Sequence, residues 1–281
     1  MKRRALLQAA LACAACPARA QQDHSIAAAN DLPVRVERDI AYGAHPRQRL
    51  DAYLPGAASG PLLVVVHGGA WRGGDRRAPS LLPKVRYWTA RGYVVVSTGY
   101  RVLPQAHPLE QARDVARALA LVQRRASGWG ADAAAVVLMG HSSGAHLAAL
   151  LSAEPALARE QGADRWRGTV CLDNPAFDVP QLMAQRHAKL YDRAFGTHPA
   201  YWRTVSPLHV LARDGRTLLA VCSRRSAPAC AQAEAFAARA GRLGIRVEVL
   251  PADRGHLELD RQLGLPGAYS DSVERWINSI L

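Results

Sequence analysis

Cysteine, lysine and long apolar runs are all scarce in this sequence of 281 residues. Five cysteines are too few to hold a chain of this length together as a disulfide scaffold. The apolar run from Ala5 to Cys16 is too short to cross a bilayer, which argues against stable membrane insertion. Apolar residues nevertheless make up 49% of the chain, enough for a core, so a disordered tail protein is also excluded.

Lysine is nearly missing from a chain that is strongly basic. Lysine and arginine together number 36 against 23 aspartates and glutamates, which gives a formal net charge of +13. Such a charge raises nucleic acid or an anionic membrane as partners. Only Lys2, Lys84 and Lys189 are lysines, and the scattered arginines form no basic run beside interleaved aromatics, as a nucleic-acid groove would need. We therefore expect no nucleic-acid partner, and the charge favours solubility.

The first twenty residues have the pattern of an export signal. Three basic residues at positions 2–4 precede the apolar run, and a small-x-small sequence at positions 18–20 offers a cleavage site. The opening resembles a twin-arginine signal, and export by the Sec route stays open. We predict that residues 1–20 are removed, that residues 21–33 form a flexible segment, and that the protein is periplasmic or secreted.

Three cysteines remain after such a cleavage. In an oxidising compartment Cys222 and Cys230 could pair across a short loop, which would leave Cys171 as a buried thiol within an apolar run. The alternative, two unpaired thiols, stays open, because spacing alone does not fix the geometry of a disulfide.

Apolar runs alternate with segments of helical length after residue 33. The leading segments Val34–Ile40 and Gln48–Leu54 indicate a hairpin. Six further strands are predicted at Leu62–Val66, Tyr93–Ser97, Ala135–Met139, Thr169–Leu172, Thr217–Val221 and Ile245–Leu250. Helices are predicted at Leu109–Arg125, Ser143–Ser152, Gln232–Leu243 and Ser270–Leu281. The order predicts one α/β domain over residues 34–281, with a mostly parallel central sheet and helices on both faces.

The stretch from Pro175 to Pro207 fits no strand and is rich in histidine, tyrosine and tryptophan. We predict that residues 175–207 form a small helical, cap-like insertion over the sheet. Long insertions of this kind commonly supply a lid or a wall of the substrate site.

A Gly-x-Ser-x-Gly sequence, Gly140 to Gly144, follows one predicted strand and precedes a predicted helix. In that context the sharp turn exposes Ser142 above the sheet as a nucleophile. The N–H of Ser143, at the start of the helix, would face a developing oxyanion. His141 belongs to the same turn and is a candidate for the substrate pocket.

A second glycine-rich turn, His67-Gly68-Gly69-Ala70-Trp71, follows the strand Leu62–Val66. Small residues let the main chain approach a substrate carbonyl, so Gly69 and Ala70 are expected to supply N–H donors that join Ser143. His67 is expected to pin the loop by a hydrogen bond. Trp71 is expected to line the substrate pocket, and simple cover of the core is an equal alternative.

These motifs resemble those of the α/β-hydrolase superfamily over most of residues 34–281. The sequences H-G-G-A-W and G-H-S-S-G-A-H-L, and Tyr100-Arg101 ahead of a helix carrying Asp114, are similar to those of the hormone-sensitive-lipase-like carboxylesterases. They are equally similar to those of arylformamidases and of feruloyl and acetylxylan esterases. The resemblance implies the α/β-hydrolase fold and hydrolysis of a carboxylic ester or amide without a cofactor, with Tyr100, Arg101 and Asp114 as structural residues.

Ten histidines offer candidates for the general base, and His256 meets both conditions of chain order. It follows the last predicted strand and precedes the last predicted helix, Ser270–Leu281. The histidines at positions 187, 198 and 209 lie in or beside the predicted cap, where they are expected at the surface, and contact with the substrate stays open as an alternative. No paired-cysteine or His-Glu-x-x-His pattern supports a metal site.

The acid of the triad is the difficult member. Such hydrolases usually place an aspartate after the next-to-last core strand, where this chain has Cys222 to Cys230 without a carboxylate. We expect the acid to be Asp173, at the end of Thr169–Leu172, in a setting similar to that of some lipases of the superfamily. Three other carboxylates, and a Ser-His dyad oriented by Ser226 or water, stay open as alternatives; the carboxylates are those of Asp178, Asp253 and Glu258.

Three functions follow as hypotheses. The first is a secreted serine esterase that cleaves small-molecule carboxylic esters through a Ser-His-acid mechanism. The second is an arylformamidase acting on amides of the N-formylkynurenine type, against which the export signal argues. The third is a non-catalytic binding protein on the same fold, suggested by the loop without an acid. Intact nucleophile and oxyanion motifs favour the enzymes, and the oligomeric state stays open.

Overall fold

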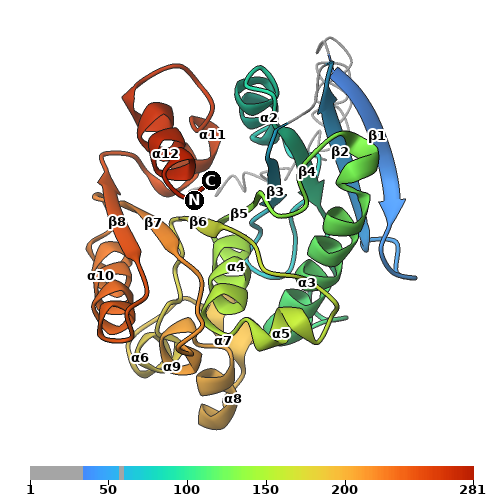
Figure 1. Ribbon diagram of the computed structural model, residues 1–281. Helices are drawn as coiled ribbons and strands as arrows, with labels where there is room; N and C mark the ends of the chain where they lie inside the picture. The colour runs from blue at the N-terminus through green and yellow to red at the C-terminus, as the bar shows by residue number, and fades with distance from the viewer. Residues whose placement is uncertain (1–33, 57–59) are drawn as a thin grey trace, which may run out of the picture.

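The computed structural model describes residues 34–56 and 60–281, so the predicted export signal and the segment 21–33 lie outside the described residues. The centre of the fold is an eight-stranded sheet with the strand order β1-β2-β4-β3-β5-β6-β7-β8 (Figure 1). The strands are β1 Val34–Ala41, β2 Arg49–Pro55, β3 Leu62–Val66, β4 Val94–Thr98, β5 Val136–His141, β6 Gly168–Leu172, β7 Leu218–Ser223 and β8 Val247–Ala252.

The sheet is mostly parallel, as predicted. The hairpin β1–β2 is antiparallel and β2 joins β4 in antiparallel register, whereas β4, β3, β5, β6, β7 and β8 all run parallel. Every residue of β3, β4, β5 and β6 is buried. Continuous apolar runs are therefore the sequence signature of strands that are covered on both faces.

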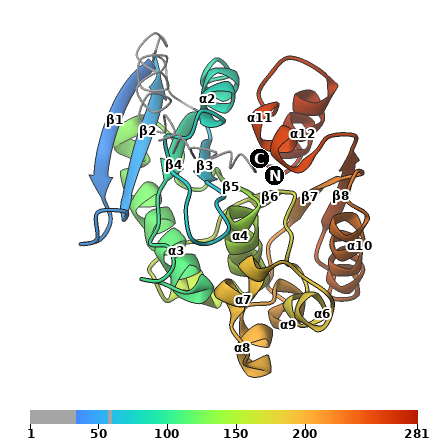
Figure 2. The same ribbon diagram turned by 180° about the vertical axis from the view of Figure 1, so that it is seen from behind.

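Helices cover both faces of the sheet (Figures 1 and 2). One face carries α2 (Leu81–Thr89), α11 (His256–Arg261) and α12 (Ala268–Asn278), which pack on the sheet in a single apolar cluster. The other face carries α3 (Pro108–Arg125), the short turn η1 (Ser127–Trp129), α4 (Ser143–Ala153), α5 (Ala156–Arg159) and α10 (Ala227–Arg242). Because both faces are covered, the sheet edge at the strand ends is left for the site.

The main differences from the sequence prediction concern helices α2, α10 and α11. Helix α2 was not predicted, although its buried residues Leu81, Val85 and Trp88 recur at helical spacing. Helix α10 begins at Ala227 rather than at Gln232, because a proline in its first turn favours a helix start. A short helix, α11, begins at His256 itself and precedes the last helix.

The segment 175–207, predicted as a cap-like insertion, contains helices rather than strands. Four short helices lie between β6 and β7, namely α6 Val179–Ala184, α7 Lys189–Phe195, α8 Pro199–Thr204 and α9 Pro207–Val210. Three of them begin with a proline in the first turn, which has no N–H to leave unpaired there. Among the described residues, no helix combines the length and apolar character that crossing a membrane requires.

Candidate active site

Ser142 stands at the turn between β5 and α4. Its backbone has φ 52° and ψ −120°, a conformation that side-chain-bearing residues rarely adopt and that is typical of functional sites. A Cβ at Gly140 or Gly144 would collide with neighbouring main chain, so both positions require glycine. The Ser142 N–H donates to Leu172 O at 2.9 Å, which ties the turn to the end of β6. The local geometry is therefore that of the predicted nucleophile turn.

A line of hydrogen bonds joins Ser142, His256 and Asp173. The His256 Nε2 lies 2.9 Å from Ser142 Oγ, and the His256 Nδ1 lies 2.7 Å from Asp173 Oδ2. The Asp173 carboxylate is buried, whereas the His256 side chain is 44% exposed. An imidazole held in this way can accept a proton from the serine hydroxyl on one nitrogen, while the carboxylate fixes its tautomer through the other.

Asp173 reaches His256 because parallel strands bring their carboxyl ends to one edge of the sheet. It directly follows β6, which lies between β5, the strand of the nucleophile, and β7. The Asp173 N–H donates to Val221 O at 2.8 Å, and its backbone has φ 50°. Aspartate tolerates this left-handed conformation better than most residues.

The other carboxylates considered for this role are engaged elsewhere. Asp178 accepts the Gln181 N–H at 3.0 Å and so caps α6. Asp253 and Glu258 both pair with Arg225, at 3.0 and 2.9 Å. Ser226 precedes α10 at the cavity wall. The structure therefore places Asp173, of the residues considered, against His256 Nδ1.

The glycine-rich loop after β3, residues 67–71, lies against the nucleophile turn and is called the oxyanion loop below. A Cβ built on Gly68 would stand 3.0 Å from His141 Nδ1 and 3.2 Å from Ser142 Cβ. Gly69 has φ 139° and Ala70 has φ 52°. Within the described part of the chain, neither the Gly69 N–H nor the Ala70 N–H has a hydrogen-bond acceptor. Together with the Ser143 N–H at the start of α4, these donors are available to an oxyanion.

His67 holds this loop in place through contacts with Gly68 and Tyr100. Its ring stacks on Tyr100 with a centroid separation of 4.4 Å, and its Nδ1–H donates to Gly68 O at 2.8 Å. The Tyr100 hydroxyl donates to His67 O at 2.7 Å. Burial lowers the pKa of His67 to about 4, so the ring is neutral at physiological pH. Tyr100 and His67 thus act on the loop as structural residues.

Trp71 belongs to the core and also lines the cavity. Its indole N–H donates to His146 Nδ1 at 3.2 Å, and the His146 Nε2–H donates to Val205 O at 2.7 Å. Burial lowers the pKa of His146 to about 4, which keeps this ring neutral. The chain of bonds connects the oxyanion loop, helix α4 and the segment after α8. Both roles expected for Trp71 are therefore combined in one side chain.

His141 also has a structural contact that its sequence position did not indicate. Its Nε2–H donates to the backbone carbonyl of His256 at 2.9 Å, and the two rings lie 4.7 Å apart. Burial lowers the pKa of His141, which favours the neutral donor form. The side chain lines the cavity as expected, and it also holds the backbone of His256 in place.

A cavity of about 1370 Å³ opens over Ser142 and His256. The segment between β6 and β7 contributes an apolar wall through Leu182, Leu190 and Tyr191. The lining also includes a buried ion pair between Lys84 Nζ and Asp260 Oδ1 at 2.8 Å. Burial alone would raise the pKa of Asp260, but the Lys84 ammonium lowers it to about 2. The cavity is large enough for a substrate with groups on both sides of the scissile bond.

Two further features bear on the chemistry of the site. Cys222 and Cys230 are joined by a disulfide, and Cys171 is a buried free thiol. In the part of the chain that the structure describes, no group of three or more His, Cys, Asp and Glu side chains could hold a metal ion.

Sequence reasoning missed Ser223, whose N–H donates to Asp173 Oδ1 at 2.9 Å, because no motif marks a main-chain donor.

The oxyanion loop offers a direct test through Gly69. A Cβ at Gly69 would collide with the backbone of Gly73 and Gly74, so Gly69→Ala must displace the N–H donors. For the ester hydrolysis that the sequence predicts, we expect kcat to fall by about 10²–10³-fold, the effect of losing one oxyanion donor. Steady-state kinetics would measure this. Gly128→Ala is the control, because a Cβ there meets open space, and an equal loss in both variants would contradict the assignment.

Comparisons with known proteins show which proteins this chain is similar to. Residues 50–170 match the family described as BD-FAE. The probable isoprenylcysteine alpha-carbonyl methylesterase ICMEL2 of Arabidopsis thaliana is 36% identical over 130 residues, which cover 46% of this chain and 30% of that protein. Esterase LipC of Mycobacterium tuberculosis is 29% identical over 205 residues, which cover 67% of this chain and 50% of that protein. Kynurenine formamidase of Danio rerio is 33% identical over 117 residues, which cover 40% of this chain and 37% of that protein.

The chain thus spans half or less of the length of these curated relatives. Among solved structures, esterase B from Lactobacillus rhamnosis superposes with a TM-score of 0.69 at 21% identity, covering 93% of this chain and 92% of that one. At this level of identity the likeness concerns the fold alone, and it confirms the architecture predicted from the sequence.

Proposed function

On the α/β-hydrolase fold that this chain adopts, we propose that it is a serine hydrolase acting on carboxylic esters of small molecules. One observation carries the proposal, namely the line of hydrogen bonds from Ser142 Oγ through His256 to Asp173 beneath the cavity. The esterases among its relatives support the reaction class. A binding protein would have no need of this relay, which consists of Ser142, His256 and Asp173. The loop after β7 carries no carboxylate, and Asp173 supplies the acid in its place.

The mechanism follows from the positions of these groups. Ser142 Oγ attacks the ester carbonyl carbon while His256 Nε2 takes its proton, and the Gly69, Ala70 and Ser143 N–H groups stabilise the oxyanion. His256 then gives the proton to the leaving alkoxide, which departs and leaves an acyl group on Ser142. Water enters beside the half-exposed His256, which activates it, and hydrolysis of the acyl-enzyme restores the serine.

We also propose that the protein is exported through its N-terminal segment and acts in the periplasm or outside the cell. The basic, apolar and small-x-small pattern of residues 1–20 supports this location. The disulfide between Cys222 and Cys230 supports it independently, because disulfides persist in oxidising compartments and are rare in the cytosol.

Amide hydrolysis is the second candidate, favoured by the likeness to a kynurenine formamidase. The two reactions are separated by assaying a short-chain nitrophenyl ester and N-formylkynurenine side by side with the purified protein. We expect a burst of nitrophenol, ester turnover well above formamide turnover, and labelling of Ser142 by a fluorophosphonate mapped by mass spectrometry. Faster turnover of the formamide would favour formamidase activity over the proposed esterase activity. Absence of both labelling and turnover would overturn both proposed activities.

A further inference from the structure

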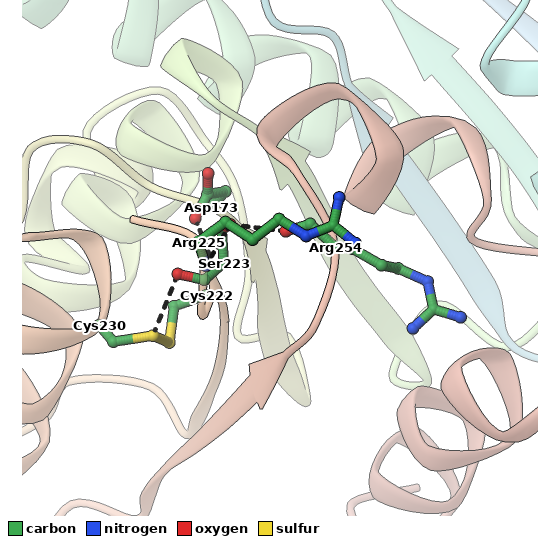
Figure 3. Close-up of a disulfide and its surroundings, with 6 residues drawn as sticks. All are labelled: Asp173, Cys222, Ser223, Arg225, Cys230 and Arg254. Atoms are coloured by element: carbon green, nitrogen blue, oxygen red, sulfur yellow. Dashed lines mark hydrogen bonds between the residues drawn. A yellow bond between two sulfur atoms is a disulfide. The ribbon is translucent and has the colours of Figure 1, made fainter. Parts of the chain in front are cut away.

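The loop after β7 contacts Asp173 and the carbonyl of Arg254, two residues before His256, although it carries no carboxylate (Figure 3). It begins at Cys222 and Ser223, the last residues of β7, and returns to Cys230 in the first turn of α10. The Cys222–Cys230 disulfide therefore closes the loop between the end of a buried strand and the start of a helix. The relay of Ser142, His256 and Asp173 takes no side chain from this loop, so the contacts of the loop with Asp173 and Arg254 require another explanation.

Ser223 contacts the acid and the base loop at the same time. Its N–H donates to Asp173 Oδ1 at 2.9 Å, the carboxylate oxygen that His256 does not contact. Its hydroxyl donates to the Arg254 carbonyl at 2.5 Å, two residues before His256. Ser223 is 1% exposed, and its bond to Asp173 is buried, so water does not compete for that bond. One buried residue thus holds the orientation of the carboxylate and the position of the loop that carries the imidazole.

The rest of the loop adds contacts in the same direction. The Arg224 N–H donates to Ala252 O at 2.9 Å, which continues the pairing of β7 with β8. The Arg225 N–H donates to the Ser223 hydroxyl at 3.2 Å, so that hydroxyl both donates and accepts. The Arg225 guanidinium pairs with Asp253 and Glu258 on either side of His256, but these side chains are largely exposed and their pairs are weak. The buried bonds of Ser223 are the principal link.

We infer that Ser223 is a positioning residue for the Asp173–His256 pair, and that the Cys222–Cys230 disulfide holds it in place. The loop that lacks a catalytic acid thereby supports the acid supplied from β6. This inference rests on the proposed esterase mechanism. Because a misplacement of a catalytic group by about 1 Å costs on the order of 100-fold in rate, loss of this support is expected to act on kcat rather than on KM.

The first test removes the hydroxyl of Ser223. Ser223→Ala is expected to lower kcat by about 10-fold to 100-fold with KM nearly unchanged. Ser223→Thr and Ser223→Val form a matched pair, since they have the same shape and only threonine keeps the hydroxyl. We expect threonine to retain most of the activity that valine loses. Equal activity of the threonine and valine variants would overturn the role of the hydroxyl.

A double-mutant cycle separates positioning from general stability. If Ser223 acts through the relay, Ser223→Ala costs far less in an Asp173→Asn background, where the relay is already broken. The far-downfield proton signal of the His256 Nδ1–H, observed by NMR, is expected to weaken in Ser223→Ala alone. The same loss of rate in both backgrounds, with an unchanged proton signal, would overturn the inference.

The second test removes the disulfide without touching the relay. Cys222→Ala combined with Cys230→Ala is expected to lower kcat by about 10-fold, measured well below the unfolding temperature. A dithiol reductant, which converts the disulfide to two thiols and is itself oxidised, should lower the activity of the wild type and not that of the double variant. Cys171→Ala is the control for effects of the remaining thiol.

The outcomes distinguish the two proposals. If the wild type shows no ester turnover, or turnover that does not depend on Ser142, the proposed esterase itself is overturned. Turnover that depends on Ser142 but is unaffected by Ser223→Ala, by the double cysteine variant and by reductant would overturn only the role assigned to the loop.

Discussion

Replacing Ser142 with alanine is expected to lower kcat for ester hydrolysis on the order of 10⁶-fold, the scale seen when the nucleophile of a triad is removed. The alanine keeps a Cβ at the same φ of 52°, so the turn bears the same backbone strain and the change deletes only Oγ. The thermal unfolding midpoint should therefore change little. Residual turnover would come from substrate binding and the oxyanion donors alone.

Steady-state and pre-steady-state assays of a nitrophenyl ester measure this loss, and the burst should vanish with it. Ser272→Ala is the matched control, because that serine is half-buried on α12, where its hydroxyl donates to Ala268 O. A Ser142→Ala variant that kept wild-type turnover, with the fold intact by circular dichroism, would show that another group performs the attack.

The sequence predicted the strands and the nucleophile turn because both depend on local patterns. Continuous apolar runs such as Leu62–Val66 and Ala135–Met139 are typical of strands covered on both faces, and the predicted bounds agree with the structure to within two residues. Helix α2 was missed because its nine residues include Pro83, which interrupts the usual helical signal. Its buried Lys84 hid the apolar face further, since a lysine normally indicates the exposed side.

The residues of the candidate site also differ in whether a local pattern marks them. Ser142, Gly69 and His256 could be assigned from motifs and chain order, whereas the acid depends on which strand ends face His256 in space. Asp173 and His256 are separated by 83 positions, and nothing local marks their contact of 2.7 Å. The support from Ser223 was inaccessible to sequence reasoning because its donor to Asp173 is a backbone N–H that every residue but proline carries.

Asp173→Asn tests that spatial assignment, and its expected effect is a loss of about 10⁴-fold in kcat with KM nearly unchanged. Asparagine has the same shape and tolerates the φ of 50°, so the fold should be preserved. The Ser223 N–H will keep an oxygen facing it, which turns the amide NH₂ toward His256 Nδ1. The imidazole must then carry its proton on Nε2, where it can no longer accept the proton of Ser142.

The control for this change is Asp178→Asn, in which the same substitution removes a charge from the cap of α6 and leaves His256 untouched. We expect that variant to keep nearly all of the wild-type kcat. Because the wrong tautomer blocks proton transfer and not attack alone, both acylation and deacylation should slow in Asp173→Asn, and single-turnover kinetics resolve the two steps. A rate near that of the wild type in folded Asp173→Asn, or an equal loss in Asp178→Asn, would remove Asp173 from the triad and leave a Ser-His pair oriented by other groups.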